Sequence, residues 1–364
     1  LHQILGYFKV KEHLKTDWVP KVLNEKFRGD DFLNPRGAEG LGDGLKENFK
    51  ARFDEYFSNI DKFFDRDSID PSYLCSLLRE IDEMLRNKKS LSDNQYISLL
   101  QLFDSIRKSG EAKMFEKSAN DSWMADWITV HKMMSDIVLN ILGDIKDSNV
   151  FKDNRKLIFG VIKYLLSIKS SPDAEDDKRE SDEPFHVAIN SVRGQAYIAF
   201  VQFTYNDGKV LGEDVKALYK QVLDNDNSNS VRFLIGHHLG AFYYRDTSFI
   251  KEVLPSILPK NESGKEKLYF ASWEGYLSGT LYQELFEELQ EYYDYAIKIP
   301  VENYPDRKYS KGLDETLAAH LALAYAHFDF NLKDPLLDLF WKTPNENRHY
   351  QFASFLGRHY LTRD

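Results

Sequence analysis

Apolar residues recur every three or four positions through most of this chain, which is the spacing that gives a helix one apolar face. The clearest run is 188–203, where the apolar positions are Ile189, Val192, Ala196, Ala199, Phe200 and Phe203. A second run has the same period after Val231, with Leu234, Ile235, Leu239 and Phe242. Each run is therefore predicted to form a helix with one buried side.

The same spacing predicts helices on both sides of these runs. In the first half of the chain they are 1–27 (as one helix or a pair), 45–64, 71–86, 91–107, 122–142 and 150–168. In the second half they are 213–223, 248–258, 281–297, 313–330, 334–342 and 348–360. Alternating strand patterns are almost absent, so the fold is predicted to be all-α.

Arginines near the start of three runs indicate an internal repeat. Arg193 and Arg232 are 39 residues apart, and Arg348 follows 116 residues after Arg232, close to three further steps of that size. A spacing near 40 residues between helix pairs is typical of HEAT repeats. We therefore predict a HEAT/TPR-like helical-repeat solenoid, in which each helix pair packs on its neighbours.

Three helix starts are marked by the residue types that cap helices. Asp70-Pro71 and Asp334-Pro335 each place a capping aspartate before a proline at the first helical position. The run from Thr343 to Glu346 predicts a capping box in which Thr343 is the N-cap.

Two segments interrupt the helical pattern and suggest how the chain is divided. Residues 28–44 contain five glycines among charged residues and are predicted to be a loop. Residues 170–184 are predicted to be an acidic flexible loop, since an acidic tract buries too little apolar surface to order itself. The chain is thereby divided into an N-terminal helical-repeat subdomain, 1–169, and a C-terminal HEAT-like subdomain, 185–364.

Composition and charge narrow the classes of function. The chain has 364 residues, of which 42% are hydrophobic, enough for a large core. Its net charge of −10 argues against general nucleic-acid binding, because no surplus of cations is available to neutralise phosphates. A single cysteine, Cys75, suits a reducing cytoplasm, and no 18-residue apolar run predicts a membrane span. The chain does not begin with Met, so we expect it to be part of a longer protein.

Motifs for catalysis or cofactor binding are absent from the sequence. Gly264-Lys265 is not followed by Ser or Thr, as a phosphate-binding loop requires, and there is no His-Glu-x-x-His zinc helix. His237 and His238 are adjacent and point in different directions, while His320 and His327 lie roughly on one face of a helix. Packing histidines are favoured over a metal site. We expect no cofactor, no metal and no enzymatic activity within this chain.

The repeated arginines have two interpretations. Arg193, Arg232 and Arg348 could line one edge of a concave surface and bind an acidic ligand. Alternatively, each could bond carbonyls or carboxylates of the adjoining repeat, because stacked repeats need their polar groups satisfied. The second interpretation is favoured, and Arg193 and Arg232 remain candidates for a binding surface.

Aromatic residues are concentrated between Tyr269 and Tyr295. Phe270, Trp273 and Leu277 have the spacing of a buried helical face. Four further tyrosines cannot all share that face, and tyrosine is enriched in protein interfaces. They are our candidates for a partner surface: Tyr276, Tyr282, Tyr292 and Tyr293.

An ordered series of short motifs carries a resemblance to a known family. The motifs are 188–194, 231–236, Leu254-Pro255 with Leu258-Pro259, 271–277, 295–297 and 339–341 with 355–358. In this order they resemble the C-terminal helical-repeat region of bacterial and archaeal antiviral STAND NTPases of the Avs type. Similar modules occur beside sirtuin-type NADase domains in defence proteins. The resemblance covers about residues 185–361.

That resemblance implies a sensor. In such proteins an effector and an NTPase precede the repeat region, which binds a viral protein and triggers assembly. This chain has neither effector nor NTPase motifs, so any such activity, and any self-assembly it drives, would belong to sequence outside it.

Three functions follow as hypotheses. The leading one is a non-enzymatic, cytoplasmic recognition module for phage sensing in antiviral defence, binding a phage structural or packaging protein. The alternative is a helical scaffold for host protein–protein assembly with no viral ligand. An enzyme is the third, and it would need a pocket built from histidines and carboxylates distant in sequence.

Overall fold

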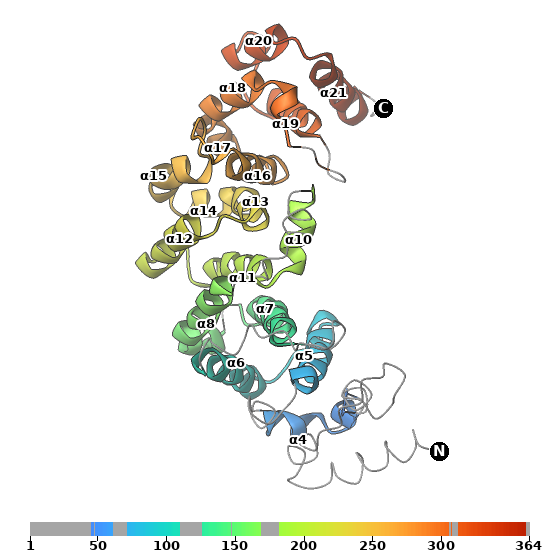
Figure 1. Ribbon diagram of the computed structural model, residues 1–364, viewed down its shortest axis with the longest axis vertical. Coiled ribbons are helices and arrows are strands. Elements are labelled where there is room, and N and C mark those ends of the chain that lie inside the picture. The colour runs from blue at the N-terminus through green and yellow to red at the C-terminus, as the bar shows by residue number, and fades with distance from the viewer. Residues whose placement is uncertain are drawn as a thin grey trace, which may run out of the picture. The chain divides into compact units, whose positions relative to one another are not determined.

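The computed structural model describes residues 45–60, 71–109, 126–168, 182–305, 307 and 312–361, except residues 47 and 147. Every regular element within these ranges is helical and none is a strand, which confirms the all-α prediction (Figure 1). The predictions for 1–44, and for 170–181 of the acidic segment, lie outside the described residues. No helix in the described part of the chain is long and apolar enough to cross a membrane.

The described residues belong to two compact units, and each is considered by itself. The first unit contains the described residues up to 168 together with 191–207. Its helices are α4 (Phe53–Phe57), α5 (Pro71–Arg86), α6 (Asp93–Lys108), α7 (Trp127–Asp144), α8 (Asn149–Ser167) and α11 (Val192–Asn206). Helix α7 packs between α5 and α11, and α8 contacts both α6 and α11. Arg155 of α8 forms an ion pair with Asp207, just after α11.

The second unit contains residues 182–190 and 208–361. It begins with α10 (Pro184–Asn190), α12 (Glu213–Asn225), α13 (Asn229–His237), α14 (Leu239–Arg245), α15 (Thr247–Ile257) and α16 (Glu266–Leu277). It continues with α17 (Gln283–Glu288), α18 (Gln290–Lys298), η2 (Val301–Asn303), α19 (Leu313–His327), α20 (Pro335–Lys342), α21 (Glu346–Leu356) and η3 (Gly357–Leu361).

The contacts of the second unit pass from helix to helix in chain order. Helix α13 packs between α10 and α16, α16 contacts α19, and α19 contacts α21 (Figure 1). Other helices pair beside this row, with α12 against α15 and α18 against α20.

The two units do not follow the predicted boundary at 170–184. The sequence predicts that α10 and α11 both belong to the C-terminal subdomain, whereas the structure assigns α10 to the second unit and α11 to the first.

The crossing of α13 and α16 depends on two glycines. A Cβ atom added at Gly236 would lie 1.8 Å from the carbonyl oxygen of Ser272, and one added at Gly275 would lie 1.9 Å from that of Phe233. Both distances are far inside van der Waals contact. The backbones of the two helices therefore touch, and only glycine fits at either position.

Several predicted helices are each divided in two. The run 188–203 breaks at Ser191, whose side chain accepts a hydrogen bond from Gly194 N at 3.0 Å and caps α11. The run after Val231 breaks at His238, and 281–297 breaks at Leu289. His238 and Leu289 have φ near −95° and ψ of 10°, so the chain continues in a helix-like turn and the apolar period passes through the break.

The predicted caps of the last two helices have different outcomes. Asp334 accepts a hydrogen bond from Leu336 N at 2.9 Å and Pro335 is the first residue of α20, as predicted. Thr343 does not cap α21. The N-cap is Asn345, which accepts from Arg348 N at 3.0 Å, while the Thr343 hydroxyl donates to the Leu339 carbonyl. Asn345 competes successfully because asparagine caps helices at least as well as threonine.

Candidate functional site

The aromatic residues of α16 and α18 form a buried cluster. Trp273 is fully buried, as predicted, and its ring centroid lies 5.3 Å from that of Tyr276 and 5.0 Å from that of Tyr293. Tyr276 is only 2% exposed, so the expectation that it lies off the buried face is wrong. Helices α13, α15 and α19 all pack on α16, and residues of α18 and α19 cover its Tyr276 side.

A chain of hydrogen bonds crosses this cluster. The Tyr293 hydroxyl lies 3.1 Å from that of Tyr276 and 2.8 Å from Nδ1 of His320. Burial lowers the pKa of His320 to about 4, and a hydrogen bond with the Leu277 backbone acts in the opposite direction. The Tyr293 hydroxyl donates to that of Tyr276 and so bridges Tyr276 and His320.

Tyr276, Tyr293 and His320 have hydrogen-bond partners in this buried cluster, whereas Trp273 Nε1 has none within the described residues. Burial raises the pKa of Tyr276, and that of Tyr293, well above the ordinary value for tyrosine. His320 is neutral at pH 7 for the same reason, so all three side chains are uncharged. The interpretation of His320 as a packing histidine agrees with these contacts.

Tyr292 is also buried, on a different side of α18. Its side chain is only 3% exposed, and the ammonium of Lys260 lies 4.6 Å from the ring centroid. Lys260 also pairs with Glu291 at 2.8 Å. Three of the four candidate tyrosines, Tyr276, Tyr292 and Tyr293, are thus covered by the protein itself.

Arg232 is buried and is bonded to backbone carbonyls. Its guanidinium donates to Leu223 O in the last turn of α12, to Asp226 O at 3.2 Å, and to Ser256 O in the last turn of α15 at 2.9 Å. A cation at a helix C-terminus also interacts favourably with the helix dipole. Arg232 therefore joins the ends of two helices.

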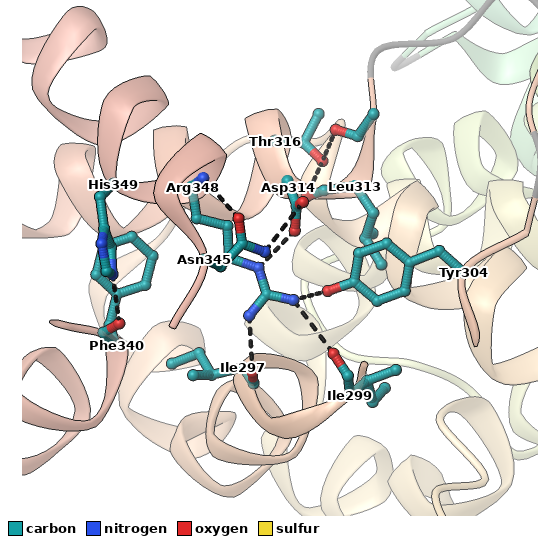
Figure 2. Close-up of polar contacts among 11 residues, drawn as sticks. Ile297, Ile299, Tyr304, Leu313, Asp314, Thr316, Phe340, Asn345, Arg348 and His349 are labelled. Atoms are coloured by element: carbon teal, nitrogen blue, oxygen red, sulfur yellow. Dashed lines mark hydrogen bonds and ion pairs between the residues drawn. The ribbon is translucent and has the colours of Figure 1, made fainter. Parts of the chain in front are cut away.

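Arg348 has an equivalent role farther along the chain. Figure 2 shows its guanidinium reaching from α21 to Asp314 of α19, to the Tyr304 hydroxyl, and to the carbonyls of Ile297 and Ile299. The bond to Ile297 O measures 2.7 Å and lies in the last turn of α18. Burial lowers the pKa of Arg348 to about 10, so the group stays protonated at neutral pH.

Arg193 lies in another part of the molecule. It is half-buried in α11 and belongs to the first unit, whereas Arg232 and Arg348 belong to the second. The favoured interpretation, an arginine that bonds its neighbours, describes Arg232 and Arg348.

Tyr282, the fourth candidate tyrosine, lies at the surface with 49% of its side chain exposed. Its ring rests on α14 at Gly240, where an added Cβ would lie 2.6 Å from Tyr282 Cε2. Gly240, Tyr243 and Tyr244 are three and four residues apart and share one face of α14. We call Tyr243, Tyr244 and Tyr282 the tyrosine patch.

Two members of this patch were missed from the sequence. Tyr244 is 88% exposed, and the Tyr243 hydroxyl lies 3.5 Å from Glu284 O. Within 241–245 only Phe242 continues the apolar period, which leaves the two following tyrosines outside the core. The presence of Tyr243 and Tyr244 beyond the apolar period of this helix was the signal in the sequence that could have identified them as surface residues.

Comparisons with known proteins add no relative. No family model matches the chain, and it has no match among curated proteins or solved structures. Function is therefore inferred from the chain's own residues.

Proposed function

We propose that this chain is a non-enzymatic recognition module that binds another protein through its second unit. The observation that carries the proposal is the tyrosine patch, in which the side chains of Tyr244 and Tyr282 are exposed, whereas Tyr276, Tyr292 and Tyr293 of the same unit are buried. Exposed tyrosines provide interface area at a low cost in side-chain entropy, and tyrosine is enriched among interface hot spots.

The proposed architecture is a HEAT/TPR-like solenoid. Its support is the order of contacts in the second unit, from α10 through α13, α16 and α19 to α21, with neighbouring helices paired beside that row. Arg232 and Arg348 support the same architecture, since each bonds carbonyls at the end of a helix from a neighbouring pair. Such stacks offer extended binding surfaces.

The finer part of the proposal concerns the partner. The resemblance of 185–361 to the repeat region of antiviral STAND NTPases favours a phage structural or packaging protein as the ligand. An NTPase and an effector, encoded outside this chain, would convert that binding into a response. A scaffold for host proteins is the alternative, because exposed tyrosines fit either partner.

A direct binding experiment tests the proposal and separates the two partners. The purified chain is immobilised and exposed to individually expressed phage structural and packaging proteins, and separately to proteins of the host. Saturable binding of a phage protein that is weakened by Tyr282→Ala supports the proposal. Binding of host proteins alone favours the scaffold, and no protein binding contradicts recognition altogether.

A further inference from the structure

The tyrosine patch has a fixed shape. Tyr282 immediately precedes α17, and its ring lies over Gly240 at a distance that leaves no room for a larger residue. Leu285 of α17 approaches the same point, 3.8 Å from the added Cβ position. The half-exposed Tyr282 ring therefore packs on α14 at Gly240, on the face that also carries Tyr243 and Tyr244.

Carboxylates of α17 lie beside this patch. Glu284 and Glu287 of α17 are exposed, and within the described residues neither has a cationic partner. Both lie close enough to Tyr243 to raise the pKa of its hydroxyl, together with Glu288, although desolvation is the largest cause of that rise. The nearby cation Lys251 pairs with Glu288 at 2.5 Å, which leaves Glu284 and Glu287 uncompensated.

From this arrangement we propose that the tyrosine patch, with Glu284 and Glu287 at its edge, binds a partner segment that carries lysine or arginine. The inference rests on the proposed function and names the chemistry of its partner. A lysine ammonium or an arginine guanidinium is attracted to the face of an aromatic ring, and a carboxylate beside the ring adds a charge-assisted hydrogen bond. Phosphates and acidic segments would be repelled by the same carboxylates.

Two other surface sites among the described residues differ from this patch. Tyr350 of α21 is 68% exposed and Glu346 lies one helical turn before it, but Tyr350 is the one tyrosine of that helix. Lys216 and Lys220, which lie near Phe249, are already paired with Asp246 and Glu252. The assignment therefore depends on several tyrosines lying together beside carboxylates that have no cationic partner in the described residues.

The test uses the full chain and a dye-labelled peptide of alternating lysine, arginine and alanine, with a glutamate-containing peptide as the negative control. Affinity is measured by fluorescence anisotropy at low and at physiological salt. The patch variants are Tyr282→Ala, the pair Glu284→Gln with Glu287→Gln, and Gly240→Ala, which pushes the Tyr282 ring from its position. Matched controls outside the patch are Tyr350→Ala and the pair Asp224→Asn with Glu302→Gln.

We expect Tyr282→Ala to weaken basic-peptide binding about tenfold or more. The glutamine pair should weaken it severalfold and reduce its salt dependence, since screening acts on exposed charges. Gly240→Ala should also weaken it severalfold, with no loss of folding. Equal losses in the control pair would show diffuse attraction to an acidic protein and overturn the assignment, as would unchanged binding in all patch variants.

Repeating the measurement with a captured phage or host protein separates this inference from the proposed function. If that protein binds and the patch variants keep full affinity, the patch assignment fails while recognition stands. If no protein binds but the basic peptide depends on the patch, the patch assignment is supported and the proposed function fails.

Discussion

Two groups of tyrosines in the second unit differ in environment although they come from neighbouring helices. Tyr276 and Tyr293 lie inside, against Trp273 and His320, with their hydroxyls joined in one hydrogen-bond chain. Tyr282 lies only six residues after Tyr276, yet half of it is exposed and its ring rests on Gly240 of another helix. The residue type is the same, and the neighbours decide its role.

The comparison separates stability from binding. Removal of a buried ring leaves a cavity and breaks hydrogen bonds, so the effect appears in the free energy of unfolding. Removal of an exposed ring leaves the core unchanged, so any effect appears in partner affinity. The predictions below test this separation, beginning with the largest expected change.

Trp273→Ala should lower the free energy of unfolding by about 3–5 kcal/mol, because it removes the largest ring of the buried cluster. Trp341→Ala is the matched control, since Trp341 is 39% exposed and its removal leaves a smaller cavity. Urea unfolding of both variants measures the difference. Equal losses for the two would contradict the burial that the cluster requires.

Gly275→Ala should cost about 3 kcal/mol, because the new methyl group would collide with the Phe233 carbonyl and force α13 and α16 apart. Gly143→Ala is the control, since nothing lies within 4 Å of its added Cβ near the end of α7. There the better helix propensity of alanine should stabilise by about 0.5–1 kcal/mol. Thermal unfolding compares the two, and opposite signs are expected.

Tyr293→Phe should destabilise by about 1–3 kcal/mol, because it leaves the Tyr276 hydroxyl and His320 Nδ1 without their shared partner. Tyr269→Phe provides the control: Tyr269 is equally buried, and within the described residues its hydroxyl has no hydrogen-bond partner. That change should be neutral or stabilising. If both variants lose the same stability, the hydroxyl chain contributes nothing.

Acid should weaken the second unit through His320. Its folded-state pKa is lowered from 6.5 to about 4, so its contribution to stability is complete above pH 6.5 and is lost as the pH falls toward 4. At pH 5 the loss should be about 2 kcal/mol relative to pH 7. His238, also lowered to about 4, acts in the same direction. Unfolding of wild type and His320→Gln at the two pH values isolates the His320 share, and an equal pH effect in both would contradict it.

The fold class and the burial of Trp273 could be predicted from the sequence, because both follow from the spacing of apolar residues within a single helix. The period of apolar residues identified most helices and the burial of Trp273, and Asp334-Pro335 correctly marked the start of α20. It did not reveal the breaks at His238 and Leu289, because a helix-like turn preserves the period.

The candidate site could be predicted only in part. The period of α16 describes one face, and it cannot tell that neighbouring helices also cover the side that carries Tyr276. The tyrosine patch joins Gly240 to Tyr282, residues 42 positions apart that meet only through tertiary packing. No local pattern connects them, so Tyr243 and Tyr244 were not selected.

The separation of core from binding surface is tested most directly on Tyr276→Ala and Tyr282→Ala, measured side by side for unfolding free energy and for affinity toward the basic peptide. Tyr276→Ala should cost about 3 kcal/mol or more of stability. Tyr282→Ala should change the free energy of unfolding by no more than about 0.5 kcal/mol, and it should weaken binding of the basic peptide about tenfold or more. A Tyr282→Ala variant that unfolds like Tyr276→Ala, or that binds the peptide as tightly as the wild type, would contradict the account.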